Sequence, residues 1–279
     1  MPLRRAEDVA PYRLVASTCA QKKIPLLEFC RGDSVEELKK KVAAVRIGDA
    51  VPGLLDGLVK KGDRVLCVVP IDESAPKGRL ILPQVQVLRA CLDLHATCTV
   101  CQPEELARWL LVGGFELVIT DSQAFRAVKE ALAASGKTIP LTSFSILFAR
   151  QKGDLAEYVK GLKAIKGLQD GDKVLVAEGC THHRQCNDIG TVKIPKALEK
   201  LSGKKLKFEF ASGGAFAIEQ SSNRTIKQFS LVVQCGGCML TRREVLRRIR
   251  VANEQGIPIV NYGLVLAAAA GVEVEKCVS

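Results

Sequence analysis

Two cysteines that could bind a metal, Cys235 and Cys238, are three residues apart and have two glycines between them. An apolar run at residues 229–233 precedes them, and a basic helical pattern begins near Thr241. This context predicts a buried strand that turns directly into a helix. Thiolates at this spacing can bind one metal ion or one iron–sulfur cluster, and the glycines let the backbone fold tightly and offer N–H groups to sulfur. We therefore expect a metal-binding turn.

A second group of potential ligands follows another expected strand, at residues 173–177. Cys180, His182 and His183 come directly after it, and they include two of the three histidines in the chain. If both strands belong to one parallel sheet, their carboxyl ends meet at the same edge, which is where α/β folds bind ligands. The spacing and the context together predict one metal site built from both loops.

The polar loop after Cys180 contains further side chains whose role stays open. Cys186 is either a spare ligand or an incidental thiol. Asn187 and Asp188 can supply an oxygen ligand or simply form the turn.

Composition describes a globular protein. The 279 residues suffice for two domains, and the chain is 47% hydrophobic and 25% charged. No apolar run reaches transmembrane length, and the first residues do not resemble a secretory signal. Eleven cysteines in a chain of this length, with Cys67 inside an apolar strand, favour buried thiols over disulfides. We expect a cytoplasmic protein that does not enter the membrane.

The formal charge of +11 raises the question of nucleic-acid binding. Basic residues are spread along the chain and aromatic residues make up only 5%, so a stacking surface is missing and nucleic acid is not an expected partner. One dense basic cluster follows the CxxC turn and could hold an anionic ligand or merely solvate one helix face. Its members are Arg242, Arg243, Arg247, Arg248 and Arg250.

The order of expected elements predicts an α/β fold with two consecutive parallel-sheet βα domains after a short N-terminal piece. Residues 1–48 contain one expected strand, 24–29, and one helix opened by the capping box at Ser34. Residues 49–139 alternate between strands and helices and form a small layer of three strands. Residues 140–279 form a doubly wound sheet of about five strands, of which the first is expected at residues 139–149.

Two other patterns are better explained by structure than by chemistry. Residues 131–138 fit a loose phosphate-loop pattern, but they follow a helix and precede a strand, which is the reverse of the required order. Cys98 and Cys101 form a second CxxC, with Cys91 and His95 upstream. Residues three apart in a strand point to opposite faces, so we expect this group to pack the core.

Several longer motifs resemble the HydF-type maturation proteins of FeFe-hydrogenase. The matching segments lie at residues 70–86, 120–125, 141–150, 188–195, 235–239 and 261–263. The resemblance implies a GTPase domain, a dimerisation domain (49–139) and an iron–sulfur cluster-binding domain (140–279). Residues 1–48 resemble only the end of that GTPase domain, so we expect no GTP hydrolysis and no catalytic site in this chain.

The resemblance also implies a ligand set. The family pattern is Cys-x-His, a long gap and His-Cys-x-x-Cys; Cys180 and His182 match its first half and Cys235 and Cys238 its second, with Gln234 in place of the second histidine. It implies a 4Fe–4S cluster on three cysteines, which leaves one iron with an exchangeable fourth ligand. His182 is the first candidate for this position. Asn187 or Asp188 could supply oxygen instead, whereas Cys186 would close the site too firmly.

The implied function is that of a scaffold or carrier that assembles or delivers a two-iron precursor to FeFe-hydrogenase. The implied partners are the hydrogenase apoprotein, the other maturation proteins and a second copy of the chain. The alternative is a structural zinc domain, with the three cysteines and His182 in a closed tetrahedral site. A redox enzyme ranks last, because no nucleotide fingerprint follows a strand.

Overall fold

The computed structural model describes residues 16–20, 26–27, 34–44, 52–71, 78–179, 188–213 and 229–272. The chain divides into two units, Met1–Ala50 and Val51–Ser279. In the first unit, helix α2 (Val35–Ala44) begins at the predicted capping box. The Ser34 hydroxyl accepts from the backbone N–H of Glu37 at 3.1 Å, and the Glu37 carboxylate accepts from the backbone N–H of Ser34 at 3.2 Å. The strand expected at residues 24–29 lies largely outside the described residues.

The first sheet of the second unit has four parallel strands in the order β2-β1-β3-β4. Its strands are β1 (Arg64–Val68), β2 (Thr97–Cys101), β3 (Leu117–Thr120) and β4 (Leu141–Ser143). The connecting helices are α3 (Leu82–Asp93), the 3-10 turn η2 (Pro103–Glu105), α4 (Leu106–Val112) and α5 (Phe125–Ala134). The central strands β1 and β3 are almost wholly buried, as expected of a parallel sheet covered on both faces.

The second sheet also has four parallel strands, in the order β6-β5-β7-β8. Its strands are β5 (Lys173–Ala177), β6 (Lys207–Ala211), β7 (Leu231–Gln234) and β8 (Ile259–Asn261). Its helices are α7 (Leu155–Ala164), η3 (Ile165–Gly167), the π-helix η4 (Ile189–Lys193), α8 (Ile194–Ser202), α9 (Arg242–Glu254) and α10 (Tyr262–Ala269). Two consecutive parallel βα layers confirm the predicted fold class.

The prediction of a strand at residues 139–149 in the second sheet was wrong, both in the length of the strand and in the sheet to which it belongs. Only β4 is extended, it pairs with β3 of the first sheet, and helix α6 (Phe144–Lys152) begins immediately after it. Ser143 caps this helix by accepting from the N–H of Ile146 at 3.3 Å. Helix α6 is buried along most of its length, and periodicity alone cannot distinguish a buried helix from a buried strand. The first sheet therefore has four strands instead of the three expected, and the second has four instead of about five.

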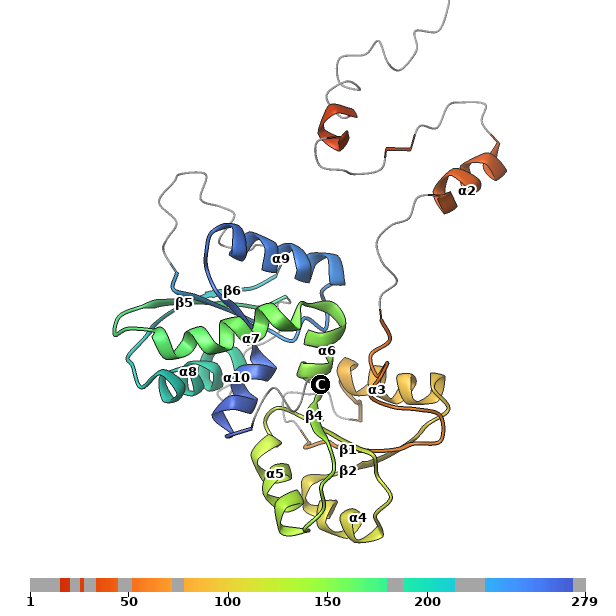
Figure 1. Cartoon of the computed structure of the whole chain (residues 1–279), viewed down its shortest axis with the longest axis vertical. Coiled ribbons are helices and arrows are strands. Elements are labelled where there is room, and N and C mark those ends of the chain that lie inside the picture. Colours follow the sequence, from red (N-terminus) through yellow and green to blue (C-terminus); the bar gives the residue numbers. More distant parts are fainter. Residues whose placement is uncertain are drawn as a thin grey trace, which may run out of the picture. The chain divides into compact units, whose positions relative to one another are not determined.

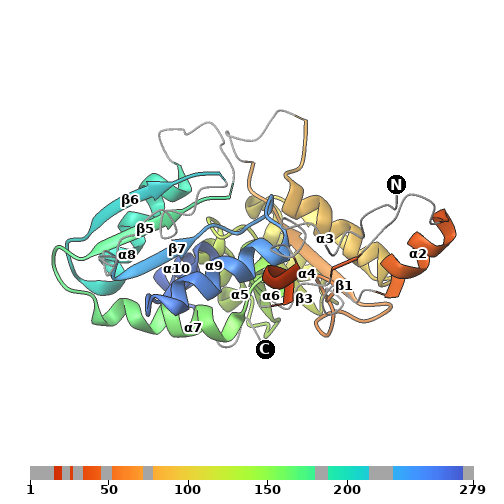
Figure 2. The same ribbon diagram turned by 90° about the horizontal axis from the view of Figure 1, so that it is seen from above.

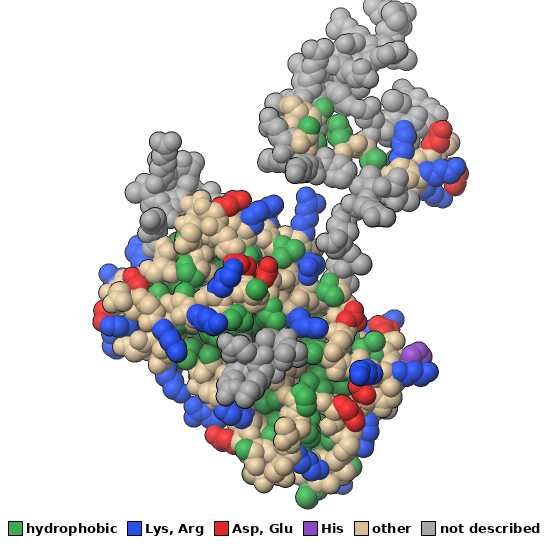
Figure 3. All heavy atoms as spheres, in the orientation of Figure 1, with side chains coloured by type: hydrophobic (Ala, Val, Ile, Leu, Met, Phe, Trp, Pro, Cys, Tyr) green, Lys and Arg blue, Asp and Glu red, His purple; other side chains and the backbone are tan. Residues whose placement is uncertain are grey.

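Helix α6 joins the two layers. It contacts α3 beside the first sheet and both α9 and α10 beside the second. Figures 1 and 2 show it between the two sheets. The space-filling view shows lysine and arginine spread over the visible face of the second unit (Figure 3). Among the helices that the structure describes, none combines the length and the apolar character needed to cross a membrane.

Candidate metal centre

The CxxC turn begins where β7 ends, beside the end of β5. The register pairs Gln234 of β7 with Ala177 of β5, and the N–H of Cys235 donates to the carbonyl of Ala177 at 2.9 Å. The two strands are thus neighbours in one parallel sheet, as the sequence predicted. The strand order also reverses between them, because β5 leads outward to β6 whereas β7 leads to β8 on the other side. Ligand sites in open α/β sheets lie at such a switch point.

The other half of the predicted ligand set is outside the described residues. Cys180 and His182 follow β5 directly in the sequence, and neither they nor Cys186 and Asn187 have a described position. No group of three histidine, cysteine, aspartate or glutamate side chains arranged for a metal occurs in the part of the chain that is described. Joint coordination by both loops therefore stays a prediction.

The sulfur of Cys235 accepts backbone hydrogen bonds. The N–H of Gly179 donates to its Sγ at 3.2 Å, which links the loop after β5 to the loop after β7. Burial raises the pKa of Cys235, while the N–H groups of Gly237 and Gly179 act in the opposite direction because they favour the thiolate. Donors of this kind suit an electron-rich metal-bound sulfur.

Two glycines let these loops approach each other. Gly237 has a φ of +68°, in the left-handed region where a side chain would be strained. A Cβ on Gly179 would lie 2.5 Å from Cγ of Leu240, so this position has no room for a side chain. Gly237 thus allows the tight backbone path expected of the CxxC turn, and Gly179, which the sequence did not single out, allows Leu240 to approach the loop after β5.

Lys152, the last residue of α6, is a partner of the turn that the sequence did not indicate. Its Nζ donates to the carbonyl oxygens of Gly237, Cys238 and Leu240 at 2.9, 3.0 and 2.8 Å. Burial lowers the pKa of Lys152, and the thiols of Cys238 and Cys235 oppose this shift. Three carbonyl oxygens of the turn therefore bind one ammonium group, and the ring centroid of Phe148 lies 4.9 Å from the same Nζ.

Asn261, at the end of β8, holds the first residue of the turn from the other side. Its Nδ2 donates to the carbonyl of Cys235 at 3.3 Å, and its Oδ1 accepts from the N–H of Gly263 at 2.7 Å, where α10 begins. The sequence singled out residues 261–263 only through the resemblance. In the structure, the side chain of Asn261 connects the carbonyl of Cys235 in the turn to the N–H of Gly263 at the start of α10.

A buried carboxylate precedes the Cys180 loop. Glu178 is 4% exposed, and the hydroxyl of Tyr262 donates to its Oε1 at 3.3 Å. A Cβ on Gly190 would lie 2.4 Å from the same oxygen, so this glycine permits the approach of η4. Burial and the nearby Glu178 raise the pKa of Tyr262, which keeps its proton. The sequence did not single out Glu178, because no local signal shows that a carboxylate directly after a strand is buried against a tyrosine 84 residues away.

Asp188 has a structural role at the start of η4. Its carboxylate accepts from the backbone N–H and the hydroxyl of Thr191 at 2.8 and 2.9 Å. These bonds form the turn, which was one of the two roles expected for this residue.

Gln234, which stands where the family has histidine, is directed into the protein. It is 1% exposed, and its Nε2 donates to the hydroxyl of Tyr158 at 3.3 Å. Its Oε1 has no hydrogen-bond partner among the described residues.

The basic cluster on α9 is largely occupied by its own neighbours. Glu244 accepts from both Arg247 and Arg248, and Arg248 also donates to the carbonyl of Gly213 at 2.9 Å. Arg242 donates to the carbonyl of Gln151. Most of the cluster therefore holds the helix in place, and the two members on its exposed side are Arg243 and Arg250.

Cys91, Cys98 and Cys101 pack the core, as the sequence predicted. The same expectation was wrong for His95, which is exposed and has a φ of +54° in the turn after α3. Cys98 and Cys101 contribute to hydrophobic clusters on opposite faces of the first sheet. The Sγ of Cys98 lies 3.4 Å from that of Cys67. Hydrogen bonding to Cys67 and burial raise the pKa of Cys98 to about 12, so the thiol stays protonated.

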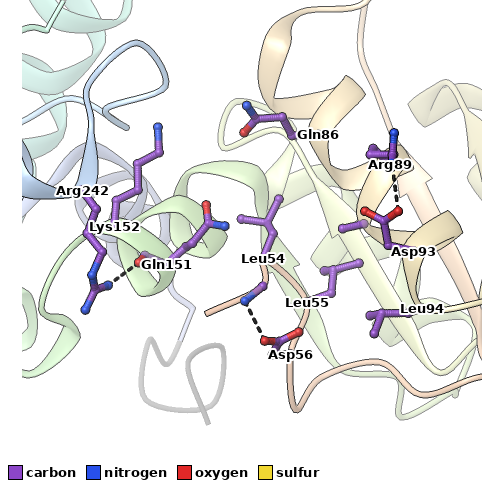
Figure 4. A pocket seen from close by; sticks show the side chains of 12 residues that line it. Leu54, Leu55, Asp56, Gln86, Arg89, Asp93, Leu94, Gln151, Lys152 and Arg242 are labelled. Carbon is purple, nitrogen blue, oxygen red and sulfur yellow. Dashed lines mark hydrogen bonds and ion pairs between the residues drawn. The ribbon is translucent and has the colours of Figure 1, made fainter. Parts of the chain in front are cut away.

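A pocket of about 470 Å³ lies between α3 and the end of α6, and it shares Lys152 with the CxxC turn (Figure 4). Lys152 and Arg242 line one side, whereas Arg89 and Asp93 of α3 form an ion pair of 2.8 Å on the other. Lys152 thus stands between this pocket and the turn.

Comparison with known families and proteins gives two matches to family models. A model described as the hydrogen maturase F dimerization domain matches residues 54–153, and one described as the hydrogen maturase F tetramerization domain matches residues 156–278. A search of curated proteins found no match.

Solved structures with partial similarity have low identity. Ligand-free aspartate transcarbamoylase from Trypanosoma cruzi is 12% identical, with a TM-score of 0.31, 87% of this chain covered and 88% of that one. An NtrC family transcriptional regulator from Clostridium acetobutylicum is 13% identical, with a TM-score of 0.23 and coverages of 77% and 98%. The bifunctional enzyme FolD from Campylobacter jejuni is 10% identical, with a TM-score of 0.27 and coverages of 78% and 87%. Similarities at this level carry no argument about function.

Proposed function

Because this chain belongs to the HydF-type family of hydrogenase maturation proteins, we propose that it binds a 4Fe–4S cluster and assembles or delivers the two-iron precursor of FeFe-hydrogenase. Family membership gives the chain its role in hydrogenase maturation. One observation carries the finer proposal: β5 and β7 are adjacent, so the loops with Cys180, Cys235 and Cys238 start from the same edge of one sheet.

The donor set fits such a cluster. Cys235 and Cys238 follow β7, and Cys235 already accepts an N–H hydrogen bond at its sulfur. We assign Cys180 as the third thiolate, since soft sulfur ligands suit iron–sulfur clusters. The cluster would supply an iron whose fourth position is exchangeable, with His182 as the first candidate to occupy it. An exchangeable position suits a carrier, because a precursor can attach there and leave again.

The test is anaerobic reconstitution with iron and sulfide, followed by metal and sulfide analysis. We expect about four iron and four sulfide per chain in the wild type, as the proposed 4Fe–4S cluster requires. Cys180→Ala, Cys235→Ala and Cys238→Ala should each reduce both contents to near background. Cys19→Ala, at a cysteine that the predicted ligand set does not include, is the matched control and should retain them.

The same analysis separates this proposal from a structural zinc site. A colourless protein with one zinc per chain, no sulfide and a fold that melts on chelation would contradict the carrier role. Full iron retention in the three alanine variants would contradict the ligand assignment.

The proposed partners are apo FeFe-hydrogenase and the other maturation proteins. The two matched domains are named for dimerization and tetramerization, which supports self-association of the chain. Delivery is tested by loading the reconstituted protein with precursor from the other maturation proteins and adding the hydrogenase apoprotein. Hydrogen evolution that depends on Cys180, Cys235 and Cys238 is expected, and equal activation by the alanine variants would contradict delivery.

A further inference from the structure

Lys152 makes contacts with the CxxC turn that go beyond ordinary packing. An ammonium group has three N–H donors, and Nζ of Lys152 has three carbonyl acceptors between 2.8 and 3.0 Å, all within residues 237–240. Its donors are therefore fully used by one short turn. These contacts span 85 to 88 residues of sequence, so they fix the turn to a helix far away in the chain.

The remaining bonds show why the turn needs such an anchor. Asn261 holds the carbonyl of Cys235, and Leu240 donates to the carbonyl of Gly237 at 3.0 Å. Neither of these two bonds involves the carbonyls of Cys238 and Leu240, and both of these carbonyls accept from Lys152. In a trans peptide the carbonyl and the following N–H point in opposite directions, so Lys152 also orients the N–H groups of the turn away from itself.

The same lysine places a positive charge beside two potential thiolate ligands. Its Nζ lies 3.0 Å from the carbonyl oxygen of Cys238 and 2.9 Å from that of Gly237, so the charge is held against the backbone of the turn that contains both cysteines. Charge near an iron–sulfur cluster, together with hydrogen bonds to its sulfurs, sets its reduction potential. A fixed cation makes the reduced, more negative cluster easier to form.

We propose that Lys152 is the positioning residue of the metal centre: it holds the CxxC turn in its ligand-ready geometry and raises the reduction potential of the cluster. The second half of this role rests on the proposed function. The first half concerns the apoprotein alone and can be measured without any metal.

The first experiment is hydrogen–deuterium exchange of the metal-free protein, followed on peptides that cover residues 235–241. Lys152→Met removes the ammonium group and keeps an unbranched side chain. Lys160→Met, on the exposed face of α7, is the matched loss of one charge. We expect exchange in the turn to become at least about tenfold faster in Lys152→Met and to stay unchanged in Lys160→Met. Unchanged exchange in Lys152→Met would overturn the positioning role.

The second experiment is a redox titration of the reconstituted proteins followed by EPR. We expect the potential to become more negative in Lys152→Met. Lys152→Arg keeps the charge but not the three-carbonyl geometry, so its potential should stay near that of the wild type while its turn exchanges faster. Equal potentials in wild type and Lys152→Met would overturn the electrostatic role.

The two experiments also distinguish failure of this inference from failure of the proposed function. A wild type that takes up no cluster would overturn the proposed function and the electrostatic role together. The exchange result would then decide the positioning role by itself. Circular dichroism of each variant shows whether it is folded, and Lys152→Arg provides a second variant if Lys152→Met unfolds.

Discussion

At the scale of single residues, the site depends on what surrounds each sulfur. Cys235 is held by N–H donors that favour the thiolate, whereas Cys98 lies among other thiols and apolar side chains. The two CxxC patterns are alike in spacing and differ in this environment. The spacing of the cysteines identifies both CxxC patterns in the sequence. Only the position of each pattern, within a strand or in the turn after one, distinguished the core cysteines from the candidate ligands.

Cys98 should therefore react slowly although it is only partly buried. Its pKa of about 12 leaves the thiol protonated at pH 8, and the reactive thiolate increases about tenfold per pH unit until that value is reached. We expect the alkylation rate of Cys98, measured by site-resolved mass spectrometry, to rise steadily from pH 8 to 10.5. A rate that levels off near pH 9 would show an ordinary thiol.

Asp188 should matter for stability and not for iron. Asp188→Ala removes the acceptor for Thr191 and should lower the free energy of unfolding by about 1 kcal/mol, the usual cost of a lost N-cap. Asp188→Asn keeps an acceptor and should cost less. Urea unfolding and iron analysis of the reconstituted variants test this. Iron loss in both variants would instead identify Asp188 as a ligand.

At the scale of elements, the sequence predicted what local patterns encode. Buried strands with turn residues after them indicated β5, β7 and the turn at Cys235. Helix α6 was missed because an apolar run of this length fits either a buried helix or a buried strand. Lys152 was missed with it, since no local signal shows that a lysine at the end of one helix meets carbonyls 85 residues away.

The packing of α7 on β8 gives a sharp test at this scale. A Cβ on Gly161 would lie 2.0 Å from the backbone oxygen of Ile259, which cannot move without disturbing the sheet. Gly161→Ala should therefore lower the free energy of unfolding by about 2 kcal/mol or more. Gly167→Ala, where nothing lies within 4 Å, should change it by less than about 1 kcal/mol. Equal effects in urea unfolding would contradict the close helix–strand contact.

At the scale of the whole molecule, two parallel layers are joined through α6, and each has a family model that matches it. Large exposed apolar side chains of the described second unit gather on the first layer. Examples are Leu92 on α3, which is 71% exposed, and Leu111 on α4, which is 86% exposed. These two helices cover opposite faces of the sheet, so the side chains do not form one patch, and the expectation of self-association rests on the two family models, which are named for dimerization and tetramerization.

We accordingly expect the purified chain to self-associate. Size-exclusion chromatography with light scattering should give a mass that is two or four times 30.2 kDa. A mass of one chain across micromolar concentrations would contradict association through these domains.

The most direct test of the central claim is EPR of the anaerobically reconstituted, dithionite-reduced protein, with and without added imidazole. We predict a 4Fe–4S signal that changes shape when imidazole binds, because one iron has an exchangeable ligand. No signal from an iron-loaded protein would contradict the cluster. A signal that imidazole leaves unchanged would contradict the open position on which the carrier role depends.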